Sequence, residues 1–440
     1  MKRVPFSCRS GAWGGGLLLL TAAMLAGWGA ARAQGQDPPP LTLTMEEALR
    51  RGEENVPLLV RARNEQLLVE ARRAGAAVLQ QFNPLVTFMG GYRYEETSTP
   101  PASGFQYQLH VEQMLEMAGQ RGTRLRAVEA AVAVARASTE YARTLMRAIV
   151  GGFYVRAVVG EQRLAVSRSR EETARRLLES ARARRDLGAS SEIEVNLARI
   201  EEGRVAAEVT AAKVALEAQL NELRVLCAIP AGTPLHLPSY QGEPPPLPPA
   251  YRSVSALLDL ALKQRADLLA IRRQRAALEA DRQRLIREAL PNPILAFDHQ
   301  RDLPGQDFYG GTVGLQIPLW NRNQGPLALV QAAETARRNE ERLLRLRLEA
   351  EVSLALNRLM LLSEQAQSFR LRALPPAEQN LELLQRGWQA GKFDLFRVIV
   401  ASRELAETRL RYLDILDDLW EAAIELERSV GQPLFSGGSK

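Results

Sequence analysis

The most regular pattern in the chain lies between Gly104 and Ala228, where apolar residues first alternate with polar ones and then recur at helical spacing. In Phe105–Leu115 the alternation has the period of a β-strand. No proline follows before Pro230, and small or apolar residues recur every three or four positions, as on one face of a continuous helix. These residues are Leu125, Val128, Val132, Ala135, Thr139, Ala142, Met146, Ile149 and Phe153, followed by Ala157, Gly160, Leu164, Ser167, Glu171, Ala174, Leu178 and Ala181.

This predicted helix is unusually long. From Gly122 to Leu187 it would rise on the order of 100 Å, which is far more than a bilayer requires. The positions Ile149, Phe153 and Ala157 add an extra step of four, a stutter, which locally relaxes supercoiling. A strand that leads into so long a helix is typical of a tube and is not needed by an ordinary globular enzyme.

A shorter helix precedes the first strand, and a return helix follows the long one. Thr42–Gln81 is predicted as the first helix, with Thr44 as its N-cap and an interruption near Pro57. Gly188 is predicted to cap the long helix, and a serine just after it begins the return helix. The long helix and the return helix therefore form a tight hairpin.

The same order of patterns then repeats. The segment 291–297 resembles the segment 82–88, which lies 209 positions earlier, and Gly391 follows Gly188 by 203 positions. One asymmetry is that Pro375-Pro376 must break the second long helix. The predicted divisions are 1–33 (signal peptide), 41–229 (first repeat: helix, two strands, long helical hairpin), 230–250 (proline-rich linker, extended), 251–431 (second repeat: helix, two strands, helical hairpin) and 432–440 (tail).

Each half contains two strands that are apolar on one face and polar on the other. This pattern fits a half-buried soluble strand, and it also fits a strand that faces lipid on one side and a wet lumen on the other. Four strands cannot close a barrel around a lumen, so several copies must share one. The predicted fold class is mainly α with a shared β-barrel: a long α-helical barrel continuous with a transmembrane β-barrel, four strands per chain.

The first 33 residues have the features of a secretory signal. A basic start and the apolar run Leu17–Gly29 precede Ala31-Arg32-Ala33, so cleavage is expected after Ala33. A retained membrane anchor is the alternative, but the run is short for a span. Cys8 precedes the apolar run, so no lipid anchor is expected.

Removing the four basic residues of this segment lowers the net charge from +6 to +2, which argues against a nucleic-acid partner.

The remaining sequence offers little for chemistry. It has no phosphate-binding glycine loop, no G-x-S-x-G and no metal-protease motif, so we expect no enzyme and no cofactor. No later stretch reaches 18 uninterrupted apolar residues, so no helix is expected to span a membrane. Cys227 is the one cysteine outside the signal and is predicted to be a small buried side chain rather than a reactive thiol.

Taken together, these patterns resemble those of the TolC-type outer-membrane efflux channels, which are also called outer membrane factors. The resemblance covers Leu41–Gly431. Its strand exits are most similar to those of the CzcC-like heavy-metal efflux branch. The features that carry it are Asn83-Pro84, Asn292-Pro293, Glu116–Gly122, Pro318–Gly325, the two glycine-centred hairpin tips and Ala373–Glu378.

The resemblance implies a homotrimer in the outer membrane of a Gram-negative cell, extending into the periplasm. It implies that the channel docks on a periplasmic adaptor, or membrane fusion protein, and on an inner-membrane pump. The channel would be a passive exit duct in a tripartite efflux system, exporting heavy metals or other cations. The alternative is a channel of the same fold for drugs, small organic molecules or secreted protein; a periplasmic coiled-coil adaptor is a further alternative.

The resemblance also implies that the hairpin tips form the periplasmic mouth and contact the adaptor. The corresponding residues are Leu187, Gly188, Ala189, Ser190 and Ser191 in the first half, and Ala390, Gly391, Lys392 and Phe393 in the second. A plain role as caps and turns is the alternative.

Some family members narrow the closed mouth with rings of Asp, six and nine residues past the second tip glycine. Here those positions hold Arg397 and Val400, and the sixth position of the first half holds Glu194. A mixed gate of Glu194 and Arg397 is one interpretation, and solvated helix charges are the other.

Other single residues are ambiguous. His110 and His299 lie in strands, on faces that could line the lumen, but no cluster has ligand spacing, so no permanent metal site is expected. Trp320 fits either an interfacial anchor or ordinary packing. The arginine run Arg168–Arg176 is predicted to be a solvated helix face.

Overall fold

The structure, a computed structural model, describes residues 40–95, 102–238, 243–302 and 305–435. The residues from Leu41 onward form one unit, which is the unit described below. The predicted signal peptide lies outside the described residues, as do most of the loop after Glu95 and the last part of the tail.

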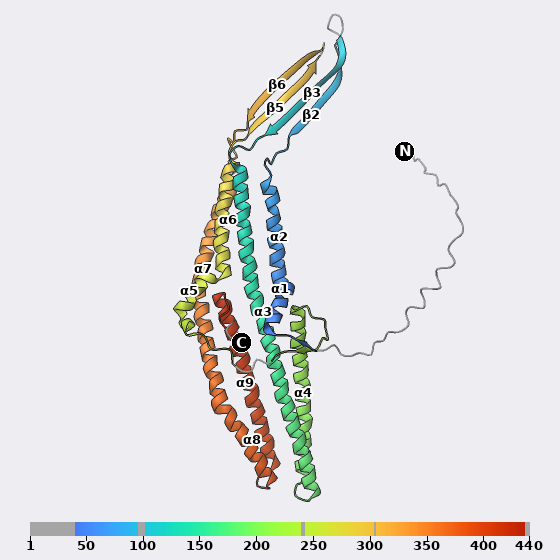
Figure 1. Ribbon diagram of the computed structural model, residues 1–440, viewed down its shortest axis with the longest axis vertical. Helices are drawn as coiled ribbons and strands as arrows, with labels where there is room; N and C mark the ends of the chain where they lie inside the picture. Colours follow the sequence, from blue (N-terminus) through green and yellow to red (C-terminus); the bar gives the residue numbers. More distant parts are fainter. Residues whose placement is uncertain (1–39, 96–101, 239–242, 303–304, 436–440) are drawn as a thin grey trace, which may run out of the picture. The chain divides into compact units, whose positions relative to one another are not determined.

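The two halves of the chain have the same order of main elements (Figure 1). The first half contains β1 (Leu41–Thr42), α1 (Met45–Asn55), α2 (Pro57–Ala77), β2 (Leu85–Glu95), β3 (Ala102–Met114), α3 (Gln120–Asp186) and α4 (Glu192–Leu226). The second contains β4 (Leu235–His236), the 3-10 helix η1 (Pro249–Tyr251), α5 (Val254–Gln264), α6 (Ala266–Glu288), β5 (Pro293–Asp302), β6 (Gln306–Leu315), α7 (Gln324–Ser368), the π-helix η2 (Phe369–Ala373), α8 (Leu374–Gln389) and α9 (Leu395–Val430).

The start of each half is set by local sequence signals. The Thr44 hydroxyl accepts a hydrogen bond from the Glu47 amide at 3.2 Å, which confirms Thr44 as the N-cap of α1. The predicted first helix is divided at Val56, because Pro57 begins α2 where its missing N–H costs nothing. In the second half, Ser253 caps α5 in the same way.

The predicted linker 230–250 contains a short strand that the sequence did not indicate. Leu235–His236 pairs in parallel with Leu41–Thr42, through hydrogen bonds that include Leu41 N–H to the Pro234 carbonyl at 2.8 Å. Leu237, next to this pair, is completely buried in the cluster that contains α1 and α3. Two-residue strands have no periodicity, so hydrophobic burial rather than strand propensity fixes this segment.

The four long strands form one antiparallel sheet in the order β2-β3-β5-β6. Residues opposite one another in the register share a face. One face is apolar and aromatic, and the other carries most of the polar side chains. The apolar face includes Val86, Phe88, Tyr92, Phe105, Tyr107, Leu109, Val111, Leu295, Phe297, Tyr309, Val313 and Leu315. No helix covers either face, since the described strands pack only on one another (Figure 1).

Both long helices begin shortly after a strand, and their first residues have the same backbone conformation and hydrogen bonding. Gly119 and Asn323, which precede α3 and α7, have left-handed backbone conformations with φ of 77° and 60°. The next residue in each case is a glutamine whose side-chain oxygen accepts a backbone N–H from two positions earlier, at 2.8 Å for Gln120 and 2.7 Å for Gln324. Gln120 also donates to the Asn292 side chain at 2.6 Å, so the first helix start is fixed to the second strand entrance.

The helix α3 is continuous over 67 residues, as the absence of proline predicts, but one residue of its predicted apolar face, Ile149 at the stutter, is exposed. Ile149 is 38% exposed, whereas Val150 and Tyr154 are buried. The reason is that α3 is covered on two sides there. Tyr154 packs with α1, and Val155 packs with α7 and α9. Repeat spacing alone cannot reveal a second covered face.

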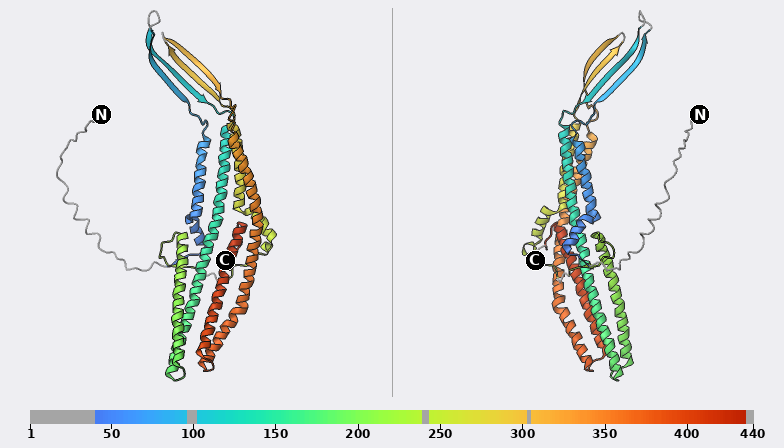
Figure 2. Two further views of the ribbon diagram at one scale, coloured as in Figure 1. Left: turned by 180° about the vertical axis from the view of Figure 1, so that it is seen from behind. Right: turned by 45° about the vertical axis from the view of Figure 1, so that its right-hand side comes forward.

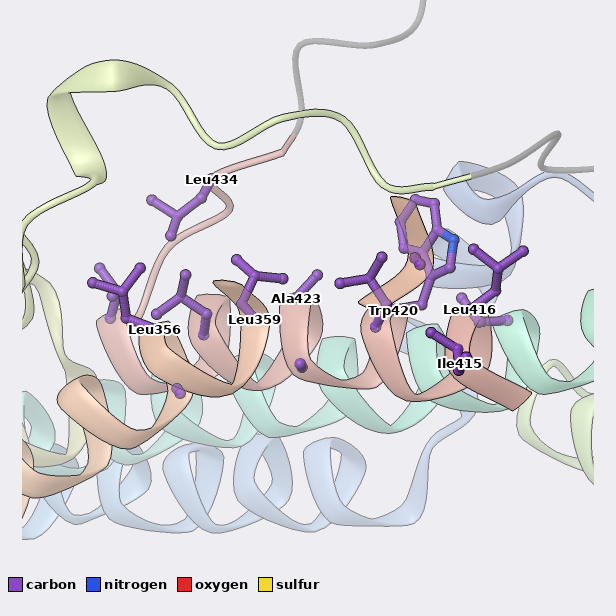
Figure 3. Packing of buried hydrophobic residues seen from close by; sticks show 14 of the residues in the cluster. Leu356, Leu359, Ile415, Leu416, Trp420, Ala423 and Leu434 are labelled. Atoms are coloured by element: carbon purple, nitrogen blue, oxygen red, sulfur yellow. The ribbon is translucent and has the colours of Figure 1, made fainter. Parts of the chain in front are cut away.

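The largest core cluster joins α9 to α5 and α7. Leu356, Leu359, Leu416 and Trp420 belong to this cluster, and Leu434 lies near Leu356 and Leu359 at one end of the row of side chains (Figure 3). Apolar burial of this kind is the main source of helix stability, because helix propensity alone is weak.

The second long helix is broken, as Pro375-Pro376 predicts. The break is a π-helical segment, η2, and the two prolines occupy the first turn of α8. The π-segment shifts the register just before the point where the prolines remove backbone donors.

Among the described helices, none combines the length and the apolar character that a membrane crossing requires.

Gly431→Ala is expected to lower the unfolding free energy by about 1–3 kcal/mol. Gly431 has φ of 86°, and an added Cβ would lie 3.0 Å from the Arg265 Cα. Gly152→Ala is the control, because its Cβ would have no neighbour within 4 Å in the chain and alanine favours a helix interior. Thermal unfolding followed by circular dichroism compares the two. Equal stability of both variants would contradict the assigned strain.

Candidate functional site: the hairpin tips and the free edges

The turn between α3 and α4 is a glycine-capped helix end. Gly188 has φ of 73°, the Ala189 amide donates to the Arg184 carbonyl at 2.8 Å, and the Gly188 amide donates to the Arg185 carbonyl at 2.8 Å. This pair of bonds defines a Schellman cap and confirms the predicted role of Gly188. Ser191 is then the N-cap of α4.

The turn between α8 and α9 repeats this geometry. Gly391 has φ of 74°, and Lys392 and Gly391 donate to the Gly387 and Trp388 carbonyls at 2.8 and 2.9 Å. Asp394 caps α9 by accepting the Arg397 amide at 2.9 Å. The two tips lie at the same end of the helices (Figures 1 and 2).

Apolar side chains at the tips are exposed. Leu187 is 84% exposed, Ile193 is 72% exposed, and Phe393 and Phe396 are also open to solvent. Exposed apolar groups gathered at one end of a molecule are typical of a contact surface for another protein. The predicted docking residues 187–191 and 390–393 belong to this end.

The two residues of the predicted gate do not meet within the chain. The Glu194 carboxylate accepts a hydrogen bond from the Ser190 hydroxyl. Arg397 lies 3.7 Å from the Asp394 carboxylate, and its guanidinium is 5.9 Å from the Phe393 ring centre. Each charge therefore has a local partner on its own tip.

The prediction that the whole run Arg168–Arg176 is solvated is wrong for one residue. Arg170 is 9% exposed and donates to Glu201 and Glu208 of α4, both at 2.7 Å. Arg204 also donates to Glu201, and Arg403 of α9 lies 3.8 Å from it. The spacing of an arginine run does not show which arginine faces the next helix. Glu201 lies seven positions from both Glu194 and Glu208, and this spacing alone does not show that Glu201 is the carboxylate that faces Arg170.

Glu201 is held ionised by this cluster. Burial alone would raise the pKa of its carboxyl, but hydrogen bonds from Arg204 and Arg170 outweigh it and keep the pKa below the ordinary 4.5. The charge therefore stabilises the folded state at neutral pH and joins α3, α4 and α9 at one point.

The two strand histidines lie on opposite faces of the sheet. His110 is on the polar face, between Asp298 at 2.8 Å and Glu112 at 3.4 Å. His299 is on the aromatic face, stacked on Tyr309 with ring centres 4.4 Å apart. The two histidines therefore cannot both line one lumen. The parity of His299 with Phe297 was the signal that sequence reasoning overlooked.

In the described part of the chain, no three His, Cys, Asp or Glu side chains are placed to hold a metal ion. Cys227 is 1% exposed, and burial raises the pKa of its thiol to about 11, so it is a buried side chain as predicted. Trp320 is 86% exposed beside the second strand exit, which excludes ordinary packing within the chain.

The sheet and the helical layer both have free edges. Within the described residues β2 pairs only with β3, and β6 pairs only with β5. α4 packs mainly on α3, and α8 packs on α9 and η2, so these helices lie at opposite sides of the lower layer (Figure 2). Ile193, Ile200 and Val214 of α4, spaced by multiples of seven, are 67–72% exposed. Leu354 and Leu361 of α7 are exposed to a similar degree.

Solved structures share this arrangement. The channel protein CusC matches with a TM-score of 0.68 at 16% identity, over 88% of this chain and 92% of CusC. The outer membrane channel CmeC of Campylobacter jejuni matches with a TM-score of 0.69 at 13% identity, over 90% of this chain and 87% of CmeC. No protein-family model matches the chain.

These matches show a fold: that of the TolC-type outer-membrane efflux channels, and they confirm the resemblance predicted from the sequence. In sequence, the chain is similar to the cobalt-zinc-cadmium resistance protein CzcC of Cupriavidus metallidurans, with 26% identity over 322 residues, which covers 72% of this chain and 75% of CzcC. The matched structures are outer-membrane channels rather than enzymes, in agreement with the predicted class and location.

Acid is expected to weaken the helical hairpins through Glu201. Because its folded-state pKa is lowered, the stabilisation is complete above about pH 4.5 and is lost as the pH falls through the folded-state value. The melting temperature of Glu201→Gln should therefore fall less between pH 6 and pH 3 than that of the natural protein. Glu172→Gln, at a carboxylate that is 70% exposed, is the control and should follow the natural protein. Parallel acid profiles for all three would contradict this role of Glu201.

Proposed function

We propose that three copies of this chain form the outer-membrane exit duct of a tripartite efflux system for heavy metals or other cations. The duct is passive, since the sequence contains no phosphate-binding glycine loop that could couple energy to transport. It receives its cargo from an inner-membrane pump through a periplasmic adaptor. The observation that carries the proposal is the four-stranded sheet, which is apolar on one face and whose two edge strands have no further partner in the described part of the chain.

The unpaired edges favour assembly. β2 and β6 each present a row of backbone N–H and C=O groups, which are costly to leave without partners in lipid. Joining β6 of one copy to β2 of the next satisfies both rows and closes a barrel. Four strands are too few to enclose a lumen, whereas three copies supply twelve. The number three rests on the resemblance to TolC-type channels.

The apolar face favours contact with lipid. Phe88, Tyr92, Phe105 and Val313 are 56–79% exposed, and none of the described helices covers them. Water contact would cost about 25 cal/mol for each Å² of this apolar surface. The opposite face, with His110, Asp298 and several glutamines, then lines the lumen.

The helices carry two exposed apolar surfaces, one on α4 and one on α7, that can pair between neighbouring copies. The exposed apolar residues of α4 recur at heptad spacing, which is typical of a coiled-coil contact, and exposed leucines follow α7. Packing α4 of one copy against α7 and α8 of the next extends the barrel into the periplasm. The tips 187–191 and 390–393 then lie at its lower end and contact the adaptor, and Glu194 and Arg397 are the candidate gate there.

The cargo is inferred from CzcC. That protein is described as a cobalt-zinc-cadmium resistance protein, and its similarity to this chain supports metal-ion cargo. Since no metal cluster is formed by the described side chains, selection of the ion belongs to the pump rather than to the duct.

Deletion of the gene is expected to lower tolerance to cobalt, zinc and cadmium, and the full-length gene should restore it. The restored protein should sediment with outer membranes and migrate as a heat-modifiable trimer in detergent. Sensitivity to organic compounds without sensitivity to metals would favour the alternative cargo. A soluble periplasmic monomer would contradict the duct and favour the adaptor alternative.

Gly188→Arg and Gly391→Arg are each expected to lower export at least tenfold while leaving the trimers intact. The reason is that each substitution places a bulky charged side chain at a tip position with a left-handed backbone. Cross-linking to the adaptor in cells measures docking directly. Gly75→Arg, an exposed glycine of α2 with no neighbour near its Cβ, is the control. If both tip variants assemble, cross-link and export normally, the tips are not the docking site.

A further inference from the structure

We propose that Gln324 of one copy donates a hydrogen bond to Asn83 of the next copy, and that this bond sets the register in which β6 joins β2. The inference rests on the proposed function, the ring of copies, and names the side chains that align one copy with the next. Gln324 and Asn83 are together called the seam pair, and the seam is the junction between β6 of one copy and β2 of the next.

The same kind of contact is already present once within each copy. Gln120, at the start of α3, donates from its side-chain amide to the Asn292 side chain at 2.6 Å, and Gln120 is only 1% exposed. Beside it, the Leu115 amide donates to the Pro293 carbonyl at 2.9 Å. The exit of β3 is thereby fixed to the entrance of β5, which is the neighbouring strand of the sheet. Because a hydrogen bond weakens steeply with distance and angle, this contact holds the two strands in one register.

Gln324, at the start of α7, repeats the local geometry of Gln120. In both cases a left-handed residue precedes the glutamine, and the side-chain oxygen accepts the backbone N–H from two positions earlier, at 2.8 Å for Gln120 and 2.7 Å for Gln324. The amide nitrogen of Gln324 donates one hydrogen to the Trp320 carbonyl at 2.9 Å. A primary amide carries two hydrogens, so the second one is available to an acceptor on another copy.

Asn83 has the same place at the entrance of β2 that Asn292 has at the entrance of β5. Each asparagine directly precedes a proline at the point where the chain enters the strand. The Asn83 side chain is exposed and makes no hydrogen bond within the described part of the chain, whereas the Asn292 side chain accepts from Gln120. The amide oxygen of Asn83 can therefore accept the second hydrogen of Gln324 from a neighbouring copy.

The topology of the sheet places the two members of the seam pair at opposite edges of one copy but at the same end of the strands. Each strand in the order β2-β3-β5-β6 is antiparallel to the next, so β2 begins and β6 ends at the end that connects to the helices (Figure 1). Gln324 follows the end of β6, and Asn83 precedes the start of β2. Pairing β6 with β2 of the next copy therefore brings Gln324 of the first copy to Asn83 of the second.

The internal repeat also gives the register at the seam. The two glutamines are 204 positions apart, and the two asparagines are 209 positions apart. In the register of β3 with β5, Gln108 lies opposite Gln300. The same shifts place Thr312 of one copy opposite Gly91 of the next. Both positions belong to the polar face of the sheet, so this register keeps that face continuous around the ring, whereas a shift by one residue does not.

Disulfide cross-linking of the full-length protein in outer membranes tests the register. Gly91→Cys combined with Thr312→Cys is expected to give covalently linked trimers on a non-reducing gel, because directly opposite Cβ atoms are about 4.5–5.5 Å apart. Met89→Cys combined with Thr312→Cys is the matched control. It keeps the same face but is shifted by two residues, so its cross-linked fraction should be at least tenfold lower. Cys227 is buried and does not compete.

Loss of either amide tests the seam pair. Gln324→Ala and Asn83→Ala are each expected to lower the ratio of trimer to monomer in diluted detergent at least fivefold, about the factor that one lost hydrogen bond produces. The double variant should lose no more than either single variant, since both substitutions remove the same bond. Gln324→Glu keeps the capping oxygen but lacks the donor, so it carries the test if the alanine variant does not fold. Gln283→Ala, at an exposed glutamine of α6, is the control and should match the natural protein.

The outcomes separate this proposal from the proposed function. A natural protein that is monomeric in outer membranes contradicts the ring of copies itself. Intact trimers in which Gln324→Glu and Asn83→Ala have no effect, or in which the two losses simply add, contradict only the seam pair. Trimers that cross-link through Met89→Cys rather than through Gly91→Cys contradict the register.

Discussion

The need to pair the backbone groups at both edges of a four-stranded sheet constrains everything else in this molecule. Among the described residues of one copy, β2 and β6 each have one unpaired side, and no helix covers the aromatic face between them. Water tolerates the free edges but not the aromatic face, and lipid tolerates the face but not the edges. In the proposed assembly a closed ring of copies satisfies both requirements, so the strands, which are a small part of the chain, would decide its quaternary structure.

The order of the helices depends on the same pairing of strands between copies. Because each strand exit turns directly into a long helix through a left-handed residue, the order of strands in the ring also sets the order of helices below it. Gln120, bonded to Asn292, fixes one helix start to the neighbouring strand entrance, so the two layers cannot rotate independently at this point. Ion pairs such as Arg163 with Asp414, 2.8 Å apart, then align α3 with α9 farther down. These partly exposed pairs add little stability, but they set register.

Sequence patterns predicted the features that depend on local chemistry. The capping glycines Gly188 and Gly391, the N-cap Thr44 and the proline break at 375–376 all act within a few residues, and each has the predicted role. Features that depend on which neighbouring element covers a surface could not be predicted from the sequence. The buried face of α3 shifts to Val150 and Tyr154 because α1, α7 and α9 all meet there. Arg170 is buried because Glu201 faces it from another helix, and the contact of Arg184 with the carbonyls of Trp388 and Gln389 joins residues more than 200 positions apart.

The short parallel pair of β1 and β4 has a consequence for biogenesis. Leu41 lies near the start of the described chain, and its partner Leu235 is synthesised almost 200 residues later. Closing so large a loop is entropically costly and slow. Leu43, which is completely buried beside this pair, therefore stays accessible to water or to a chaperone until the segment around Leu235 is available to pair. The core of the first half is therefore complete only when the segment around Leu235 and Leu237 has joined it.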